Sequence, residues 1–282
     1  MKFSPRVESI LDAMSIEEMV KMVSGRDVWH THAFPHHGVP AMRVSDGPAG
    51  VRGTRFGGGP ASLNVPCGTA LAATWDVALV EAVGELLGRE LLTKGARVHL
   101  APTVNIHRTP VGGRNFECMS EDPLLTGELA VAYVRGVQSH GVASCIKHYV
   151  GNDTEFERRS IDSQIDERTL REIYLLPFEK AVVEADVKSV MTAYNRINGP
   201  WAADAEYLLR DVLRGEWGFT GAVMSDWFGL NSTVEGMNAG LDLEMPGPTI
   251  HRGEKLLAAI RDGAVDADVL RERAGNVLAL VE

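Results

Sequence analysis

Several short apolar runs in this sequence end in a polar or ionisable side chain, and these ends carry most of its candidate chemistry. Asp226 closes one run directly before Trp227, and Lys147 and His148 close another. The other polar ends are Ser45-Asp46, Asn105, His107-Arg108, Tyr194-Asn195 and Glu244. Each hydroxyl of a sugar that enters a dry pocket needs a hydrogen-bond partner, and an aromatic ring can cover the apolar face of the sugar. The residue types therefore favour a site for a polyhydroxylated ligand around a carboxylate.

The apolar runs alternate with longer helical patterns, which is typical of parallel βαβ units. Strands are predicted over 41–45, 97–104, 143–149, 189–194, 221–225 and 241–245. Helices are predicted over 76–93, 123–140, 167–185, 205–217, 231–239 and 252–262, with a capped helix near 4–24 and a closing helix over 266–280. The irregular stretch 28–66, rich in proline and glycine, is interpreted as surface loops around the first strand.

The polar strand ends meet in either of two α/β architectures. In a (β/α)₈ barrel the active site lies at the carboxyl ends of the strands. A doubly wound open sheet also binds ligands there, but it normally carries a glycine-rich dinucleotide turn after its first strand. This sequence has neither such a turn nor a P-loop, and the glycine triplet 57–59 follows no predicted strand. We therefore favour a barrel whose strand ends converge on one mouth.

Composition restricts the function further. The chain has 282 residues, 45% of them hydrophobic, and a net charge of −10, which disfavours nucleic acid and anionic membranes as partners. No uncharged apolar stretch reaches bilayer length, and the first residues do not resemble a signal peptide, so we expect a cytoplasmic protein without a membrane partner. Cys67, Cys118 and Cys145 lack C-x-x-C spacing and are interpreted as thiols in or near the core.

Six motifs occur in a characteristic order between about residue 14 and residue 282. They are Ser45-Asp46-Gly47-Pro48, Gly113-Arg114-Asn115-Phe116-Glu117 with Ser120-Glu121-Asp122-Pro123, 143–149, 166–174, Met191-Thr192-Ala193-Tyr194-Asn195, and Val223-Met224-Ser225-Asp226-Trp227. Together they resemble family 3 glycoside hydrolases of the β-glucosidase type. The resemblance implies a single-domain (β/α)₈ TIM-barrel-like fold over residues 1–282.

The resemblance also implies retaining hydrolysis of a terminal β-D-glucosyl or related β-glycosyl residue. Asp226 would be the nucleophile that forms a covalent glycosyl-enzyme. Asp46, Arg114, Lys147, His148, Tyr194, Trp227 and Met191 would bind the sugar of a β-glucoside or oligosaccharide. Asp46 would accept hydrogen bonds from hydroxyls, Arg114, Lys147 and His148 would donate, and the nearby cations would favour the ionised form of Asp226. Neither a cofactor nor a metal is implied.

The sequence departs from this family in one important respect. Many members carry the general acid/base on a following α/β-sandwich domain, which we expect to be absent from this chain. The alternative Asp-His pair on a loop after the Lys-His strand is missing from 151–155. The missing acid would then come from such a domain or from an oligomer partner. Candidate substitutes within the chain are Glu117, Glu121, Glu155, Glu157, Glu235 and Glu244.

Other interpretations remain open at this point. One is a sugar-binding barrel with little or no hydrolytic activity, and another is an aldolase-like barrel in which Lys147 forms a Schiff base. Arg114 could instead tie its loop to Glu117 or Glu121. His30, His32, His36 and His37 match no metal-ligand spacing and are interpreted as a pocket-rim or surface loop.

Overall fold

A computed structural model describes residues 3–53 and 59–282. Five parallel strands form its main sheet, in the order β1-β2-β3-β5-β7. They are β1 (Val44–Asp46), β2 (Val98–Leu100), β3 (Ala143–Tyr149), β5 (Ser189–Thr192) and β7 (Ala222–Met224). All residues of β3 are buried, because helices cover one face of the strand and the barrel interior covers the other. Part of the glycine triplet, residues 57 and 58, lies outside the described residues.

Isolated backbone bridges continue the sheet beyond β7 and return it to β1. The bridges join Met224 to Leu243, Ser24 to Glu244, Gly25 to Thr31 and His30 to Arg43. The first two are parallel and the last two antiparallel. They close an α/β barrel of the (β/α)₈ type, as predicted. The prediction of a regular strand over 241–245 is wrong, because only single bridges form there. The strands predicted over 41–45 and 97–104 are shorter in the structure than expected.

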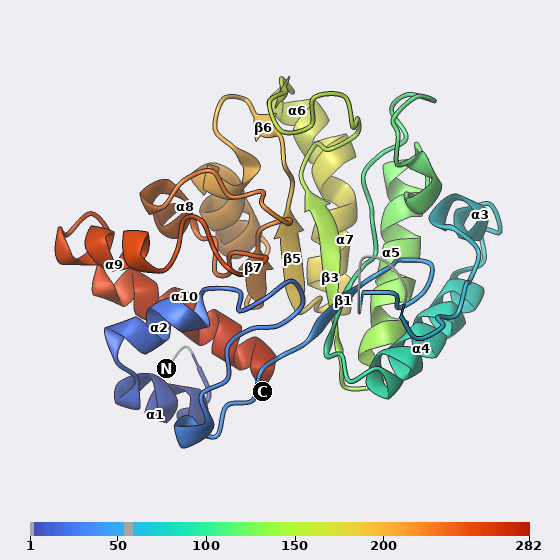
Figure 1. The fold of residues 1–282 in the computed structure, drawn as a ribbon. Helices are drawn as coiled ribbons and strands as arrows, with labels where there is room; N and C mark the ends of the chain where they lie inside the picture. Colours follow the sequence, from blue (N-terminus) through green and yellow to red (C-terminus); the bar gives the residue numbers. More distant parts are fainter. Residues whose placement is uncertain (1–2, 54–58) are drawn as a thin grey trace.

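Helices surround the sheet close to their predicted positions (Figure 1). They include α4 (Val77–Thr93), α5 (Pro123–Gln138), the continuous run α6 (Glu167–Thr169), η3 (Leu170–Leu175) and α7 (Leu176–Ala185), η5 (Tyr207–Glu216), α8 (Val234–Ala239), α9 (Glu254–Arg261) and α10 (Ala267–Val281). Side-chain caps explain several of the starts: Asp76 accepts a hydrogen bond from Leu79 N (3.0 Å), and Asp122 from Leu124 N (2.8 Å). Both η3 and η5 are π-helical.

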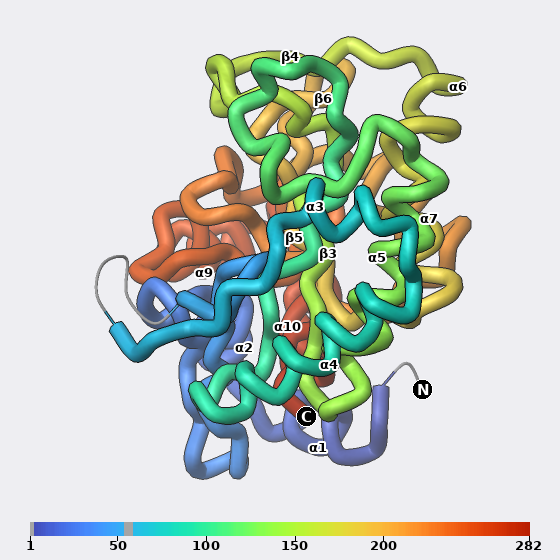
Figure 2. Tube along the Cα trace, turned by 90° about the vertical axis from the view of Figure 1, so that its right-hand side faces the viewer, coloured from blue at the N-terminus to red at the C-terminus, as the bar shows by residue number. Residues whose placement is uncertain are grey.

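The single helix expected near 4–24 is instead two helices, α1 (Pro5–Ala13) and α2 (Ile16–Met22). The chain breaks at Ser15, which accepts a hydrogen bond from Glu18 N while the Glu18 side chain accepts one from Ser15 N. This capping box starts a new helix in place of continuing the first one. Figure 2 shows α1 beside α10, where Ser4 donates a hydrogen bond to Glu282 (3.1 Å).

Smaller elements complete the described chain. They are η1 (Pro35–His37), α3 (Gly68–Ala72), η2 (Asn115–Glu117), η4 (Ala202–Asp204) and a separate two-stranded parallel sheet of β4 (Asp162–Ser163) and β6 (Arg196–Ile197). All three cysteines are free; Cys118 and Cys145 are buried as predicted, whereas Cys67 is partly exposed. Within the described ranges, none of the helices combines the length and the apolar character needed to cross a bilayer.

Candidate active site

A cavity of about 790 Å³ opens at the carboxyl ends of the barrel strands. Its polar lining includes Asp46 from β1, Lys147 and His148 from β3, Tyr194 after β5 and Asp226 after β7. Met191, Trp227 and Arg114 also line it, so the structure brings all eight sequence-predicted site residues into one place. Parallel strands meet at one rim of a barrel, and residues far apart in the sequence therefore face the same space.

Asp46 lies between two cations at one side of the cavity. Its Oδ1 is 2.6 Å from Lys147 Nζ, and its Oδ2 is 2.6 Å from a terminal nitrogen of Arg52. Burial alone would raise the pKa of Asp46, but Lys147 and Arg52 lower it to about 2. The carboxylate is therefore ionised at neutral pH and can accept hydrogen bonds from hydroxyls. Because it stays ionised, Asp46 cannot serve as a general acid.

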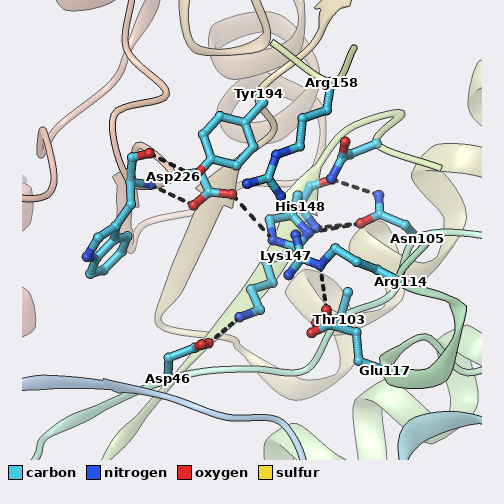
Figure 3. A network of polar contacts seen from close by, with 12 residues as sticks. Asp46, Thr103, Asn105, Arg114, Glu117, Lys147, His148, Arg158, Tyr194 and Asp226 are labelled. Atoms are coloured by element: carbon cyan, nitrogen blue, oxygen red, sulfur yellow. Dashed lines mark hydrogen bonds and ion pairs between the residues drawn. The ribbon is translucent and has the colours of Figure 1, made fainter. Parts of the chain in front are cut away.

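Asn105 fixes the orientation and the tautomer of His148 (Figure 3). Asn105 Nδ2 donates to His148 O (3.0 Å), and Asn105 Oδ1 accepts from His148 N (3.0 Å). The same Oδ1 lies 3.1 Å from His148 Nδ1, so Nδ1 must carry the proton. Burial, followed by Arg114 and Lys147, holds the pKa of His148 well below its usual value. The imidazole is thus neutral, and its Nε2 is an acceptor.

This result corrects one sequence-based expectation. His148 was expected to donate a hydrogen bond to the sugar, but its neutral Nδ1–H tautomer presents a lone pair on Nε2. That Nε2 lies 3.4 Å from Asp226 Oδ2. Two acceptors facing each other at this distance do not form a hydrogen bond. A sugar hydroxyl that enters between them could donate to either atom.

Asp226 is a buried carboxyl with one satisfied oxygen and one unsatisfied oxygen. Its Oδ1 accepts a hydrogen bond from Trp227 N (2.6 Å). In the part of the chain that the structure describes, no hydrogen-bond donor reaches Oδ2. Burial raises the pKa of Asp226 above its ordinary value, while Lys147 and Arg114 act to lower it. The cations act in the expected direction, but burial outweighs them.

Arg114 is held by two acidic side chains. Its Nε contacts Glu117 Oε1, and one of its terminal nitrogens lies 3.8 Å from Glu155 Oε1. Glu117 also accepts a hydrogen bond from Thr103 Oγ1 (3.0 Å). Burial alone would lower the pKa of Arg114, but Glu117 and Asp226 raise it further above its usual value. The loop tie to Glu117 that the sequence left open is therefore present, and Arg114 lines the cavity as well.

Aromatic side chains form another wall of the cavity. The Tyr194 hydroxyl donates to Trp227 O (2.8 Å) and lies beside Asp226, whose pKa it lowers. The indole of Trp227 donates to Val28 O (3.0 Å), and its ring centroid is 5.6 Å from that of Trp29. Arg158 lies over the Tyr194 ring at 4.4 Å. These contacts hold a flat apolar surface next to the carboxyl group.

Several lining residues were missed by the sequence reasoning. Trp29, Arg52, Arg158 and Arg159 all line the cavity, yet none ends a predicted strand. They come from loops, whose spatial position is not encoded in a local pattern. The polar stretch 151–160, directly after the Lys-His strand, was the available signal for Arg158 and Arg159.

No second carboxyl group among the described lining residues is free to act as an acid. The carboxyls that line the cavity there are Asp46, Glu117 and Asp226. Asp46 and Glu117 already hold cations. Glu244, which was expected at the mouth, does not line the cavity: its side chain accepts hydrogen bonds from Ile250 N, His251 N and Arg252 N.

Comparison with known proteins places these observations in a family. Residues 5–280 match the model described as the glycosyl hydrolase family 3 N-terminal domain. The chain is 56% identical over 277 residues to a beta-glucosidase of Rhizobium radiobacter and 52% identical to beta-glucosidase B of Emericella nidulans. Each alignment covers 98% of this chain but only 34% and 33% of the relative. The chain thus spans about a third of the length of these curated relatives.

Solved structures give the same result. The beta-glucosidase from Kluyveromyces marxianus in complex with glucose matches with a TM-score of 0.95 and 43% identity, over 98% of this chain and 33% of that chain. Beta-glucosidase 3B from Thermotoga neapolitana in complex with glucose matches with a TM-score of 0.93 and 42% identity, over 98% of this chain and 42% of that chain.

Proposed function

We propose that this chain, which belongs to glycosyl hydrolase family 3 as its N-terminal domain, carries the nucleophile and the sugar-binding groups of a retaining β-glucosidase-type hydrolase. The observation that carries the proposal is the state of Asp226. Its Oδ2 is buried without a hydrogen-bond donor among the described residues, and Asp226 lines the cavity together with other polar groups. A carboxylate oxygen without a donor keeps its lone pairs available for attack on an anomeric carbon.

The surrounding groups suit a pyranose ring in this position. Asp46 offers carboxylate oxygens as acceptors, Lys147 and Arg114 offer donors, and His148 Nε2 offers a further acceptor. Trp227 supplies a flat surface for the apolar face of the ring. In support, two of the similar solved structures are complexes with glucose. We infer that a terminal β-D-glucosyl group occupies this cavity.

In the first step, Asp226 Oδ2 would attack the anomeric carbon while the bond to the aglycone breaks. The positive charge that develops on the sugar ring in the transition state would be stabilised by the carboxylate. Water would later open the glycosyl-enzyme and free Asp226. The raised pKa of Asp226 means that ionisation of the nucleophile sets an acid limit, below which the reaction is lost.

The second carboxyl group would come from outside this chain. Retaining hydrolysis needs a partner carboxyl about 5–5.5 Å from the nucleophile. The described lining residues offer no uncommitted one, and the relatives are about three times as long as this chain. We therefore propose that the acid/base lies in a further part of the full-length protein or on an oligomer partner.

From the sequence alone, we also propose that the protein is cytoplasmic.

Trapping of the glycosyl-enzyme tests the role of Asp226. An activated 2-deoxy-2-fluoro β-glucoside should label the peptide that contains Asp226 in the protein that carries this domain, and Asp226→Asn should abolish the label. Asp211→Asn is the matched control, because Asp211 is an exposed carboxylate on η5. Labelling of another carboxylate, or unchanged labelling of the Asp226→Asn protein, would contradict the proposal.

A sugar-binding barrel without hydrolysis is the second candidate, because the described cavity lacks a free proton donor. Leaving-group dependence separates the two functions. If the 282-residue chain itself folds, it should cleave aryl glucosides with acidic phenols while leaving alkyl glucosides intact, since general-acid assistance contributes roughly 10²–10⁴-fold. Glucose binding without cleavage of any aryl glucoside would favour the binding protein. Lys147 Nζ is already engaged by Asp46 Oδ1 at 2.6 Å, which disfavours a Schiff base at this lysine.

A further inference from the structure

Three potential metal-binding side chains converge at a place that the proposed reaction does not use. Glu18 lies on α2, and His36 and His37 lie on η1. His36 Nε2 contacts Glu18 Oε1, and His37 Nε2 lies 3.4 Å from Glu18 Oε2. One ligand atom from each of the three residues lies within 4.8 Å of the other two. None of the three lines the cavity that contains Asp226.

The backbone holds the two histidines at a tight turn. Phe34 and Val39 exchange both backbone hydrogen bonds, at 2.8 and 3.1 Å, and both side chains are buried. Between them, Gly38 adopts φ +69°, a conformation that favours glycine, and its N–H donates to Pro35 O (3.0 Å). The loop is therefore anchored on both sides of His36 and His37, although the His36 side chain itself is 61% exposed.

The third group is held independently. Glu18 Oε2 accepts a hydrogen bond from Ser15 N (2.9 Å) within the capping box at the start of α2. The position of the carboxyl group is therefore set before any ligand arrives.

We propose that Glu18, His36 and His37 form a binding site for a zinc ion. Imidazole nitrogens and a carboxylate oxygen are ligands that Zn²⁺ takes, and three protein ligands leave a fourth position for water. With bonds of about 2.0–2.2 Å, the ligand atoms around a tetrahedral ion lie about 3.3–3.6 Å apart. The spacing of 3.4 Å between His37 and Glu18 already fits this value. The closer contact between His36 and Glu18 has to open for the ion to enter.

An ordinary ion pair is the competing interpretation of the cluster. Each histidine faces a different oxygen of Glu18, with His36 Nε2 against Oε1 and His37 Nε2 against Oε2. Zinc titration separates the two interpretations, because an ion pair alone takes up no saturable zinc.

The bound ion would tie the turn at 34–39 to α2. Both segments flank the bridges of Ser24 with Glu244 and of Gly25 with Thr31, which close the barrel. A ligand that binds only the folded protein raises its apparent stability. The ion is therefore a structural clamp next to the closure of the barrel.

Calorimetric titration of the chelator-treated chain with zinc chloride tests this site. We expect one saturable zinc ion per chain and a higher Tm in its presence. Each of His36→Ala and His37→Ala should weaken zinc binding by about 10-fold or more. His32→Ala is the matched control, since His32 lies in the same loop but outside the cluster, and it should bind zinc like the parent.

Two further measurements keep the outcome decisive. Circular dichroism establishes that each variant is folded; His36→Ala removes a mostly exposed side chain, so it provides a folded test even if His37→Ala does not. X-ray absorption at the zinc edge should show only nitrogen and oxygen ligands. Absence of saturable binding, sulfur ligation, or equal affinity in the parent and in His36→Ala would overturn the proposal.

Discussion

Replacement of Asn105 by alanine would remove the group that fixes the tautomer of His148. It would leave in place every group that is proposed to touch the sugar. Asn105 is 4% exposed, and its amide makes three contacts with His148, to the backbone N–H, the carbonyl oxygen and Nδ1. Without the acceptor at Nδ1, the proton can move to Nε2. An Nε2–H would then donate to Asp226 Oδ2, which lies 3.4 Å away and has no donor within the described structure.

The structure gives the size and the sign of the effect. When the proton moves to Nε2, a sugar hydroxyl loses Nε2 as its acceptor; a buried polar group without its partner costs about 1–3 kcal/mol, which corresponds to roughly 5–150-fold in sugar affinity. A new hydrogen bond to the Asp226 carboxylate stabilises its charged form and lowers its pKa. Burial has raised that pKa in the parent protein. Activity is lost as pH falls through the pKa of the nucleophile, so the acid limb of the variant should move to lower pH.

The assay combines kinetics with a direct measurement of the tautomer. The pH dependence of kcat/KM for an aryl glucoside should show the shifted limb in Asn105→Ala, together with weaker glucose binding. Nitrogen-15 shifts of His148 should report Nδ1–H in the parent and Nε2–H in Asn105→Ala.

Two results would refute this reasoning. One is an Nε2–H tautomer or an imidazolium in the parent protein. The other is a folded Asn105→Ala protein that has the parental acid limb and the parental affinity for glucose. A loss of activity without any shift of the acid limb would mean that Asn105 only supports the loop structure.

Three further predictions concern other residues of the site. Asp226→Ala should reduce kcat/KM on the order of 10³-fold or more without unfolding the protein, and parental turnover by the variant would reject Asp226 as nucleophile. Asp46→Ala should weaken glucose binding by about 1–3 kcal/mol, as measured by calorimetry. Unchanged affinity would mean that Asp46 only supports the structure of its turn. The pKa of Asp46 is about 2 against an ordinary 3.8, so its ionisation stabilises the fold by about 2 kcal/mol above pH 4. Because the pKa is lowered, this contribution disappears as pH falls from 3.8 towards 2. The difference in unfolding free energy between the parent and Asp46→Asn should therefore become smaller over this pH range. A constant difference would contradict the lowered pKa of Asp46.

The sequence by itself determined the local elements and the chemistry at their ends. Apolar periodicity placed α4, α5 and β3 close to their observed bounds, and the side chains of Asp76 and Asp166 cap the starts of α4 and α6. These signals are local, because a helix or a strand shows its buried face within a few residues. The polar ends of the strands predicted which side chains would meet, provided that the sheet was parallel and closed.

Only the tertiary structure decided the pairings between distant segments. Lys147 and Asp46 are 101 residues apart, and Trp227 and Val28 are 199 apart. The tautomer of His148 depends on Asn105, which lies at the end of another strand. The barrel closes through single bridges near Ser24, where the sequence pattern predicts no strand. The physical reason is that such contacts stabilise the chain only after the loops between them have closed, so no short window of sequence contains them.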